Sequence, residues 1–521
     1  MAFANKMNGI LVTSLVVLST ALLVWFGNGL DPWWPLLWFA PLPVLWFALR
    51  RPWWAAALVA EAAWLLGSLN LWGYFRVLGL PFAAWLSIFA VAALAFVIAV
   101  LLFRALVLQG ALWTGLLAFP ATWVALEYAR NLTSVHGTAG ILAYSQLRFL
   151  PFLQLASITG PWGMAFLLLL FPAGIAIGLH LRLTAPKKGL RIVAATVASI
   201  VVVLVFGGVR LAIPPPGPQV KAGLITSDEA TNDGVAEQGT DTERLFRSYA
   251  GEAEKLAAQG AQVIVLPEKL GVVLDSDSKN SDSIFQSLAD RTGSTFVVGQ
   301  VYVVPPHKYN QARVYQPMSA ALFYNKQHLL PPMESSLTPG TGLVTLSRTN
   351  QKWGVAICKD MDFTPLSRQY GKAGVGLMLV PGWDFNLDRS WHGHMAVMRG
   401  VEDGFSIVHA AKNGYLTVSD SRGRILAETR SDSAPFPALV VSVLAAHVAT
   451  IYLLLGDWFA WLAMGTLVFS IAQVFRLRQK NQGLKGSGES QGFSTLNLTN
   501  VADRSDQRAA ITDAGTTLRC Q

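Results

Sequence analysis

The chain has 521 residues, of which 53% are apolar and 14% charged, and its mean hydropathy is +0.42. This length is too great for one ordinary domain, and the composition is far from that of a soluble protein, so we expect a membrane protein. The net charge of +9 does not indicate nucleic-acid binding, because the basic residues lie in short loops between apolar segments and form no basic face with interleaved aromatic residues.

Apolar segments of about the roughly 20 residues that a helix needs to cross a bilayer fill the first part of the chain. We predict seven spans, near residues 10–26, 34–49, 54–72, 81–103, 112–128, 162–181 and 192–209. Together they form a transmembrane helical domain over 1–212. A further C-terminal transmembrane helix is expected over 456–477, followed by a disordered cytoplasmic tail over 478–521 that is rich in Gly, Ser, Thr and Asn.

The basic residues set the expected orientation, because Lys and Arg collect in cytoplasmic loops. Arg50 with Arg51, then Arg104, then the group from Arg182 to Arg191 fall in alternate loops. With a cytoplasmic N-terminus, seven crossings place the chain after residue 212 on the outer side of the membrane.

Residues 213–455 have the composition of a soluble domain and follow a Pro-rich linker at 214–218. Short β-rich runs alternate with helix-compatible stretches, which is typical of a layered α/β domain. We predict strands at 220–225, 263–266, 296–304, 319–324, 353–357, 376–380, 406–409 and 415–418. Helices are expected at 242–259, 281–291, 365–373 and 391–402.

Cys358 is the centre of the expected site, because it ends the apolar run 354–357 and is followed by charged residues. The only other cysteine is Cys520, so neither a disulfide framework nor a cysteine metal cluster is expected. A nucleophilic thiol needs a base, and acyl transfer needs a cation or donors that stabilise the oxyanion. Glu268 and Lys326 each end another apolar run and supply these groups. A buried structural thiol is the alternative reading of Cys358.

Several motifs carry a family resemblance. The sequences VLPE, FYNKQHLLPPME and GVAICKD, which contain Glu268, Lys326 and Cys358, resemble the Glu, Lys, Cys triad of the nitrilase superfamily. In addition, FPATWVALEYAR, LASITGPWGMAFLL, RGVEDG and GDWFAW resemble bacterial apolipoprotein N-acyltransferases, and the likeness spans roughly residues 117–461. The resemblance implies a nitrilase-like αββα sandwich on the periplasmic side of a bacterial inner membrane.

By this resemblance, Glu268 is the general base, Cys358 the nucleophile, and Lys326 with the backbone amide after Cys358 stabilises the oxyanion. The acyl donor is a phospholipid, the intermediate is a thioester, and the acceptor is the N-terminal amine of a diacylated lipoprotein. No metal or organic cofactor is expected, and the oligomeric state stays open, with a monomer as one option.

The chain departs from the family pattern directly after the cysteine, where Lys359 and Asp360 replace an aromatic residue and Glu. We expect Lys359, if it points inward, to be a second cation that favours the thiolate, and Asp360 and Glu334 to be supporting carboxylates. These departures motivate one alternative, a membrane-bound carbon-nitrogen hydrolase or an acyltransferase with another amine acceptor. A catalytically silent membrane scaffold is a further hypothesis, and the intact triad residues argue against it.

Overall fold

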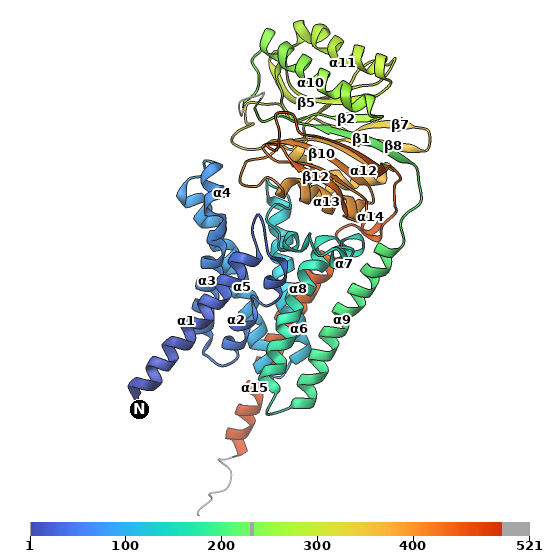
Figure 1. Ribbon diagram of the computed structural model, residues 1–521. Helices are drawn as coiled ribbons and strands as arrows, with labels where there is room; N and C mark the ends of the chain where they lie inside the picture. Colours follow the sequence, from blue (N-terminus) through green and yellow to red (C-terminus); the bar gives the residue numbers. More distant parts are fainter. Residues whose placement is uncertain (1, 230–233, 492–521) are drawn as a thin grey trace, which may run out of the picture. The chain divides into compact units, whose positions relative to one another are not determined.

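The computed structural model describes residues 2–229 and 234–491 (Figure 1). One compact unit extends to Ile471 and a second begins at Ala472. The N-terminal half of the first unit is helical. Its elements are α1 (Ala2–Gly27), η1 (Trp34–Trp38), α2 (Leu42–Ala48), α3 (Trp53–Ser68), η2 (Leu69–Leu71), α4 (Trp72–Val77), α5 (Phe82–Leu108), α6 (Leu112–Thr133), η3 (Leu142–Gln146), α7 (Leu150–Leu153), α8 (Ala156–Leu181) and α9 (Pro186–Ala212).

Within the described residues, six helices are long and apolar enough to cross a membrane. They are Gly9–Gly27, Trp53–Val77, Phe82–Leu108, Ala156–Leu181, Pro186–Ala212 and Trp458–Lys480. The single span expected at 34–49 is instead divided between the short helices η1 and α2. Pro35, Pro41 and Pro43 explain the division, because proline fits the first turn of a helix but not its interior. The expected span at 112–128 is the 22-residue helix α6, much of which is buried.

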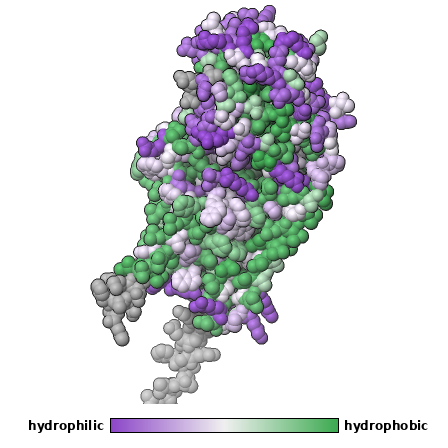
Figure 2. All heavy atoms as spheres, in the orientation of Figure 1, coloured by the Kyte–Doolittle hydropathy of each residue, from purple (hydrophilic) through white to green (hydrophobic). Residues whose placement is uncertain are grey.

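Apolar side chains are exposed along the outer helices, and Figure 2 shows them gathered over α1 and α9, whereas hydrophilic side chains gather over the upper, soluble-type domain. Such a surface is stable where hydrocarbon covers it, and it would be unfavourable in water. The chain is therefore a membrane protein. On α1 and α9 these exposed residues include Leu11, Leu15, Leu18, Leu22, Val201, Val202, Val205 and Val209.

Two sheets form the soluble domain. The first has the strand order β13-β1-β2-β4-β5-β6, with β3 beside β4, and the second has the order β12-β11-β10-β9-β8-β7. The strands of the first sheet are β1 (Gln219–Ile225), β2 (Val263–Val265), β3 (Val272–Leu274), β4 (Thr295–Val304), β5 (His307–Tyr315), β6 (Leu322–Asn325) and β13 (Ala438–Leu444). Those of the second are β7 (Val344–Arg348), β8 (Gln351–Val355), β9 (Leu377–Trp383), β10 (Ser406–Lys412), β11 (Tyr415–Ser419) and β12 (Ile425–Arg430).

An apolar core lies between the two sheets, and helices cover their outer faces (Figure 1). Helices α10 (Thr240–Ala258) and α11 (Ser278–Thr292) pack on the first sheet, with η4 (Asp275–Asp277) before α11. Helices α12 (Thr364–Lys372) and α13 (Trp391–Asp403) pack on the second, where the turn η5 (Cys358–Asp362) precedes α12. The expected αββα sandwich is confirmed.

The strands β3, β5, β7, β12 and β13 were not predicted, and β6 begins at Leu322, later than the predicted start at residue 319. The strands β5, β7 and β12 are interrupted by polar residues, so they lack the continuous apolar run that marks a strand buried on both faces. The strands β3 and β13 do have apolar sequences, VVL and ALVVSVL, but β3 has only three residues and most of β13 is exposed or half-buried.

The loop after α6 joins the helical half to the soluble domain. The backbone amide and the hydroxyl of Thr138 donate hydrogen bonds of 2.9 and 2.7 Å to the carbonyl oxygen of Asp362. The same loop is held to its own half, because the Leu142 amide donates to the Glu127 carboxylate at 2.9 Å. The loop therefore contacts both the helical half and the turn that carries Cys358.

The chain leaves the sandwich through α14 (Ile451–Leu455) and α15 (Trp458–Gln491). The helix α15 continues beyond residue 477, where a disordered tail was expected, because the polar residues that follow include good helix formers and no proline. The rest of the expected tail, including Cys520, lies outside the described residues.

Candidate functional site

The cysteine sits at a sharp turn between a strand and a helical segment. Cys358 follows β8 and begins η5 with a φ of +41°, a backbone conformation that residues other than glycine rarely adopt. Its side chain is buried, and Sγ lies 3.8 Å from the backbone carbonyl oxygen of Trp383, to which it donates a weak hydrogen bond. Strained backbone of this kind is often found where a side chain must be displayed for chemistry.

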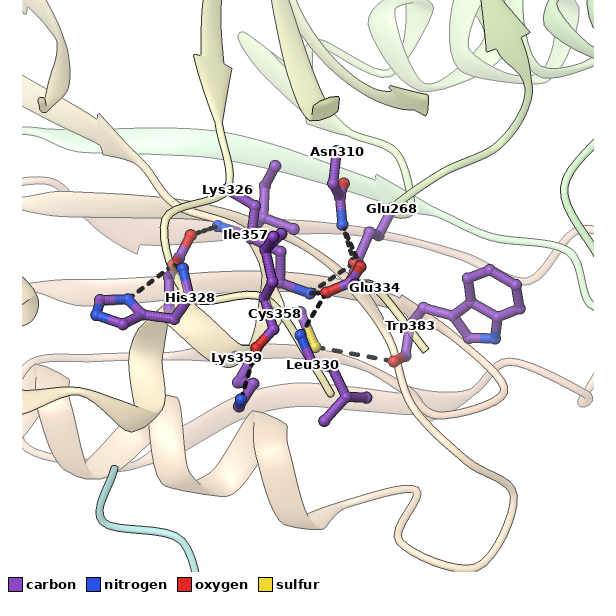
Figure 3. A network of polar contacts seen from close by, with 12 residues as sticks. Glu268, Asn310, Lys326, His328, Leu330, Glu334, Ile357, Cys358, Lys359 and Trp383 are labelled. Atoms are coloured by element: carbon purple, nitrogen blue, oxygen red, sulfur yellow. Dashed lines mark hydrogen bonds and ion pairs between the residues drawn. The ribbon is translucent and has the colours of Figure 1, made fainter. Parts of the chain in front are cut away.

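Glu268 and Lys326 meet beside this turn, as their positions after apolar runs predicted (Figure 3). Glu268 lies just beyond β2, and Lys326 follows β6 directly. The Lys326 Nζ atom donates a hydrogen bond of 2.9 Å to Glu268 Oε1. Both side chains are almost completely buried. The fold therefore brings the carboxylate, the ammonium and the thiol of the expected triad together.

Glu334 completes a buried charge cluster. Its Oε2 lies 3.0 Å from Lys326 Nζ, and its Oε1 lies 2.7 Å from Lys269 Nζ. Although burial opposes ionisation, these two ammonium groups lower the pKa of Glu334 to about 2. Burial likewise disfavours the charged form of Lys326, but the carboxylates of Glu268 and Glu334 raise its pKa well above the usual value. Glu334 thus helps to keep Lys326 cationic.

Two members of this cluster were missed from the sequence. The Asn310 amide group donates to Glu268 Oε1 at 2.5 Å and to Glu334 Oε1 at 2.8 Å, so it holds the two carboxylates side by side. Lys269 follows Glu268 with a φ of +50°, which turns its side chain toward Glu334. Lys269 could have been found from its position after Glu268, whereas Asn310 lies inside the missed strand β5 and carries no such signal.

Lys359 is buried and lines the same cavity as Cys358. Its Nζ atom donates to the carbonyl oxygens of Val135 and Leu329, at 2.7 and 2.8 Å. Two backbone acceptors therefore hold the cation that was expected to favour the thiolate. Burial, followed by the charge of Glu268, instead raises the pKa of the Cys358 thiol well above its usual value, and Lys326 offsets only part of this. A pKa raised in this way favours a neutral Cys358 thiol in the resting site.

Asp360 has a structural contact for each oxygen. Oδ1 accepts from the backbone amides of Gln327 and His328, at 3.2 and 2.9 Å, and lies 3.0 Å from His328 Nδ1. Oδ2 accepts from the Tyr324 hydroxyl at 2.7 Å and from the Ile357 amide at 3.2 Å. The buried carboxylate thus ties the turn of Cys358 to the segment that carries Lys326.

The triad lies at a cavity of about 1040 Å³ that extends into the helical half. This volume is at the upper end of small-molecule sites and leaves room for a long flexible chain. Its polar part includes Glu268, Lys326, Glu334, Cys358, Lys359, Asp362 and His392. Its apolar part comes largely from α3, α4, α5 and α6, and includes Trp64, Phe75, Phe89, Val91, Leu94, Ile98, Trp123 and Leu126.

Two family models match the chain. The apolipoprotein N-acyltransferase N-terminal domain matches residues 15–174, and the carbon-nitrogen hydrolase matches residues 236–434. An apolipoprotein N-acyltransferase from Geobacter metallireducens is 28% identical over 403 residues, which cover 69% of this chain and 74% of that protein. One from Shewanella oneidensis is 26% identical over 415 residues, which cover 71% and 75%.

Among solved structures, an amidase from Nesterenkonia sp. is similar to this chain, with 20% sequence identity and a TM-score of 0.38. The match covers 44% of this chain and 93% of the amidase chain. The two family models between them cover both the helical half and the sandwich. The alignments with the two acyltransferases are each longer than either half. The chain therefore carries an apolipoprotein N-acyltransferase N-terminal domain followed by a carbon-nitrogen hydrolase domain, and across both it is similar to apolipoprotein N-acyltransferases.

Proposed function

We propose that this protein transfers a fatty acyl chain from a phospholipid, through a thioester on Cys358, to the N-terminal amine of a diacylglyceryl-cysteine lipoprotein. One observation carries the proposal: the thiol, Glu268 and Lys326 line the same cavity as apolar residues of the helical half. A cavity with reactive groups at one end and hydrocarbon walls suits a lipid acyl ester. The proposed acceptor, an apolipoprotein amine, is inferred from the names of the relatives.

The first half-reaction needs a base, because burial keeps the thiol protonated. Glu268 fits this role. Its Oε1 is occupied by Lys326 and Asn310, whereas its buried Oε2 has no hydrogen-bond partner among the described residues. In the proposed step, Oε2 takes the thiol proton while Sγ attacks the ester carbonyl carbon.

The tetrahedral intermediate carries its negative charge on the former carbonyl oxygen. The Lys326 ammonium and the backbone amide of Lys359 are the proposed donors to this oxyanion. Its collapse breaks the ester C–O bond, Glu268 returns the proton to the leaving lysophospholipid oxygen, and the acyl group stays on Sγ as a thioester. In the second half-reaction the acceptor amine attacks the thioester, an amide forms, and the thiol is regenerated.

The proposed location is a bacterial inner membrane, with the sandwich on the periplasmic side. The exposed apolar residues of α1 and α9 support membrane insertion. The basic residues support the orientation: Arg104, near the end of α5, donates hydrogen bonds to the carbonyl oxygens of Ala48 and Arg51, so it lies beside the basic pair Arg50 and Arg51. The specific phospholipid and lipoprotein are part of the proposal.

The test is the intact mass of the purified full-length protein after incubation with phosphatidylethanolamine, before and after neutral hydroxylamine. We expect an added acyl mass that hydroxylamine removes in the wild type, and none in Cys358→Ala. The matched control is Cys520→Ala, which removes the other cysteine and should load normally.

Addition of a diacylated lipopeptide should then discharge the thioester and give an amide-linked acyl chain. Discharge to water alone would overturn the transferase and favour the hydrolase. Discharge only to other amines would keep the acyltransferase chemistry but replace the acceptor. A wild type that acquires no acyl mass would overturn phospholipid as the donor.

A further inference from the structure

A second cluster of titratable side chains lies beside the triad and has no role in the mechanism above. It is a row of carboxylate, imidazole and carboxylate. His392 Nδ1 lies 3.4 Å from Asp362 Oδ1, and His392 Nε2 lies 3.4 Å from Asp388 Oδ2. Both carboxylates are buried. The three residues come from the Cys358 turn, the start of α13 and the loop before it.

A buried carboxylate without hydrogen-bond partners lies in the same loop as Asp388. Asp384 is 1% exposed, and within the described residues neither of its carboxylate oxygens has a hydrogen-bond partner. Leaving a buried carboxylate unsatisfied is costly, so such atoms in a native fold usually have a function.

The position of the cluster links it to the reacting thiol. Asp362 and His392 line the cavity that contains Cys358, Glu268 and Lys326. A 3₁₀ turn rises about 2 Å per residue, so Asp362 lies roughly 8 Å along the chain axis from Cys358. Within the described residues, the Asp362 side chain makes one hydrogen bond, through Oδ1 to His392.

The proton balance of the second half-reaction needs a group of this kind. An α-amino group has a pKa of about 7.7–8.0, so the acceptor arrives mostly as an ammonium with three protons at neutral pH. The amide product retains one of them. Glu268 passes a second to the departing thiolate of Cys358. The third has no acceptor in the triad, whereas the ester half-reaction releases no such proton.

This inference rests on the proposed function and refines its acceptor step. We propose that Asp362 binds the ammonium group of the amine acceptor and takes its surplus proton, with His392 and Asp388 as positioning residues behind it. The N–H bond of the ammonium breaks and an O–H bond forms on Asp362, which later releases the proton to water through the cavity. The neutral amine then attacks the thioester carbon.

The electrostatics of the cluster agree with this role. Burial opposes a charge on His392, but Asp362 and Asp388 raise its pKa well above the usual value. The imidazole lies between the two carboxylates and is an ion-pair partner for both. Lys359 is also close, but its Nζ is already bound to two backbone carbonyls. The other titratable groups that influence this cluster are His136, Asp384, His409, Tyr74 and Tyr144.

The test separates the two half-reactions. Wild type and Asp362→Asn are first loaded with acyl groups from phosphatidylethanolamine, and the rate of thioester formation is measured. The acyl-enzymes are then mixed with a diacylated lipopeptide at pH 6.5 and at pH 9. Asp290→Asn, on the exposed surface of α11, is the matched control. His392→Gln tests the positioning role.

We expect Asp362→Asn to load at nearly the wild-type rate but to discharge about 100-fold more slowly at pH 6.5, the usual contribution of a general base. At pH 9 the amine arrives largely neutral, so the defect should shrink to less than about tenfold. His392→Gln should show the same pattern with a smaller defect.

A discharge rate equal to wild type at both pH values would overturn the proposal. So would a defect that does not depend on pH, or an equal loss in the loading step, since either indicates a structural role. A wild type that fails to load refutes the proposed function instead. If the wild type forms the thioester but does not transfer the acyl group to the lipopeptide, the discharge rates of wild type and Asp362→Asn are compared with a primary alkylamine as acceptor. That comparison then decides the role of Asp362.

Discussion

The Nζ atom of Lys359 donates a hydrogen bond of 2.7 Å to the backbone carbonyl of Val135. The two residues are 224 positions apart in the sequence. One follows the nucleophile directly, and the other lies in the loop after α6. Together with the bond from Lys359 to Leu329, this contact makes one buried cation the link between the helical half, the Cys358 turn and the segment that follows Lys326.

Lys359→Met is expected to loosen this link. The substitution keeps most of the length of the side chain but leaves two carbonyl groups without their charged donor, and hydrogen bonds to charged groups contribute about 1.5–3 kcal/mol each. We expect a lower melting temperature and thioester formation slowed by about tenfold or more, because a misplacement of about 1 Å can cost 100-fold. Differential scanning fluorimetry and the acyl-loading assay measure these effects. Lys372→Met, at an exposed position of α12, is the control. Wild-type values for both measurements in Lys359→Met would refute the link.

Asp360→Asn is expected to damage the site through position rather than chemistry. An amide group replaces one carboxylate oxygen, so its N–H groups must face backbone amide donors, either those of Gln327 and His328 or that of Ile357. We expect about 2–3 kcal/mol of lost stability. Thioester formation should fall with it, because Lys326 moves with this segment. A variant that unfolds like wild type in a denaturant titration would show that these contacts contribute little.

The raised thiol pKa predicts how alkylation depends on pH. Iodoacetamide reacts with thiolate, so alkylation of Cys358 should be slow at neutral pH and should increase only above the usual thiol range. Because the charge of Glu268 raises this pKa, Glu268→Gln should shift the alkylation midpoint to lower pH while acyl transfer is lost. Lys326→Met removes the neighbouring cation and should shift the alkylation midpoint to higher pH. Mass-spectrometric alkylation rates from pH 6 to pH 11 test both signs, and equal midpoints in all three proteins would contradict them.

Gly137 and Gly140 provide a matched pair in the loop after α6. Both have positive φ, +53° and +77°, so alanine is strained by about 1–2 kcal/mol at either position. A Cβ atom at Gly137 would lie 2.5 Å from the carbonyl oxygen of Asp362, whereas one at Gly140 would have no neighbour within 4 Å.

We therefore expect Gly137→Ala to lower the melting temperature more than Gly140→Ala and to slow acyl loading, because it pushes the Cys358 turn away from the loop. Fluorimetry and intact mass measure both effects on the full-length proteins. Equal behaviour of the two variants would show that the loop does not position the turn.

The triad was predictable because its residues follow short apolar runs. Such runs form buried strands, and the residue after a strand lies at the edge of the sheet. Glu268, Lys326 and Cys358 carry this signal, together with motifs that resemble a known family. The membrane half was also visible, since long apolar segments without charges have few alternatives to a membrane.

The tertiary structure decided what each neighbouring charge does. The direction of Lys359 depends on the carbonyls of Val135 and Leu329, which come from distant segments and leave no pattern around residue 359. The pairing of Asp362 with His392, and of Asn310 with two carboxylates, depends in the same way on contacts across elements. Local sequence determines strands and what ends them, because backbone hydrogen bonding and burial repeat along the chain. Side-chain partners are set by whichever segments the completed core brings within hydrogen-bond distance.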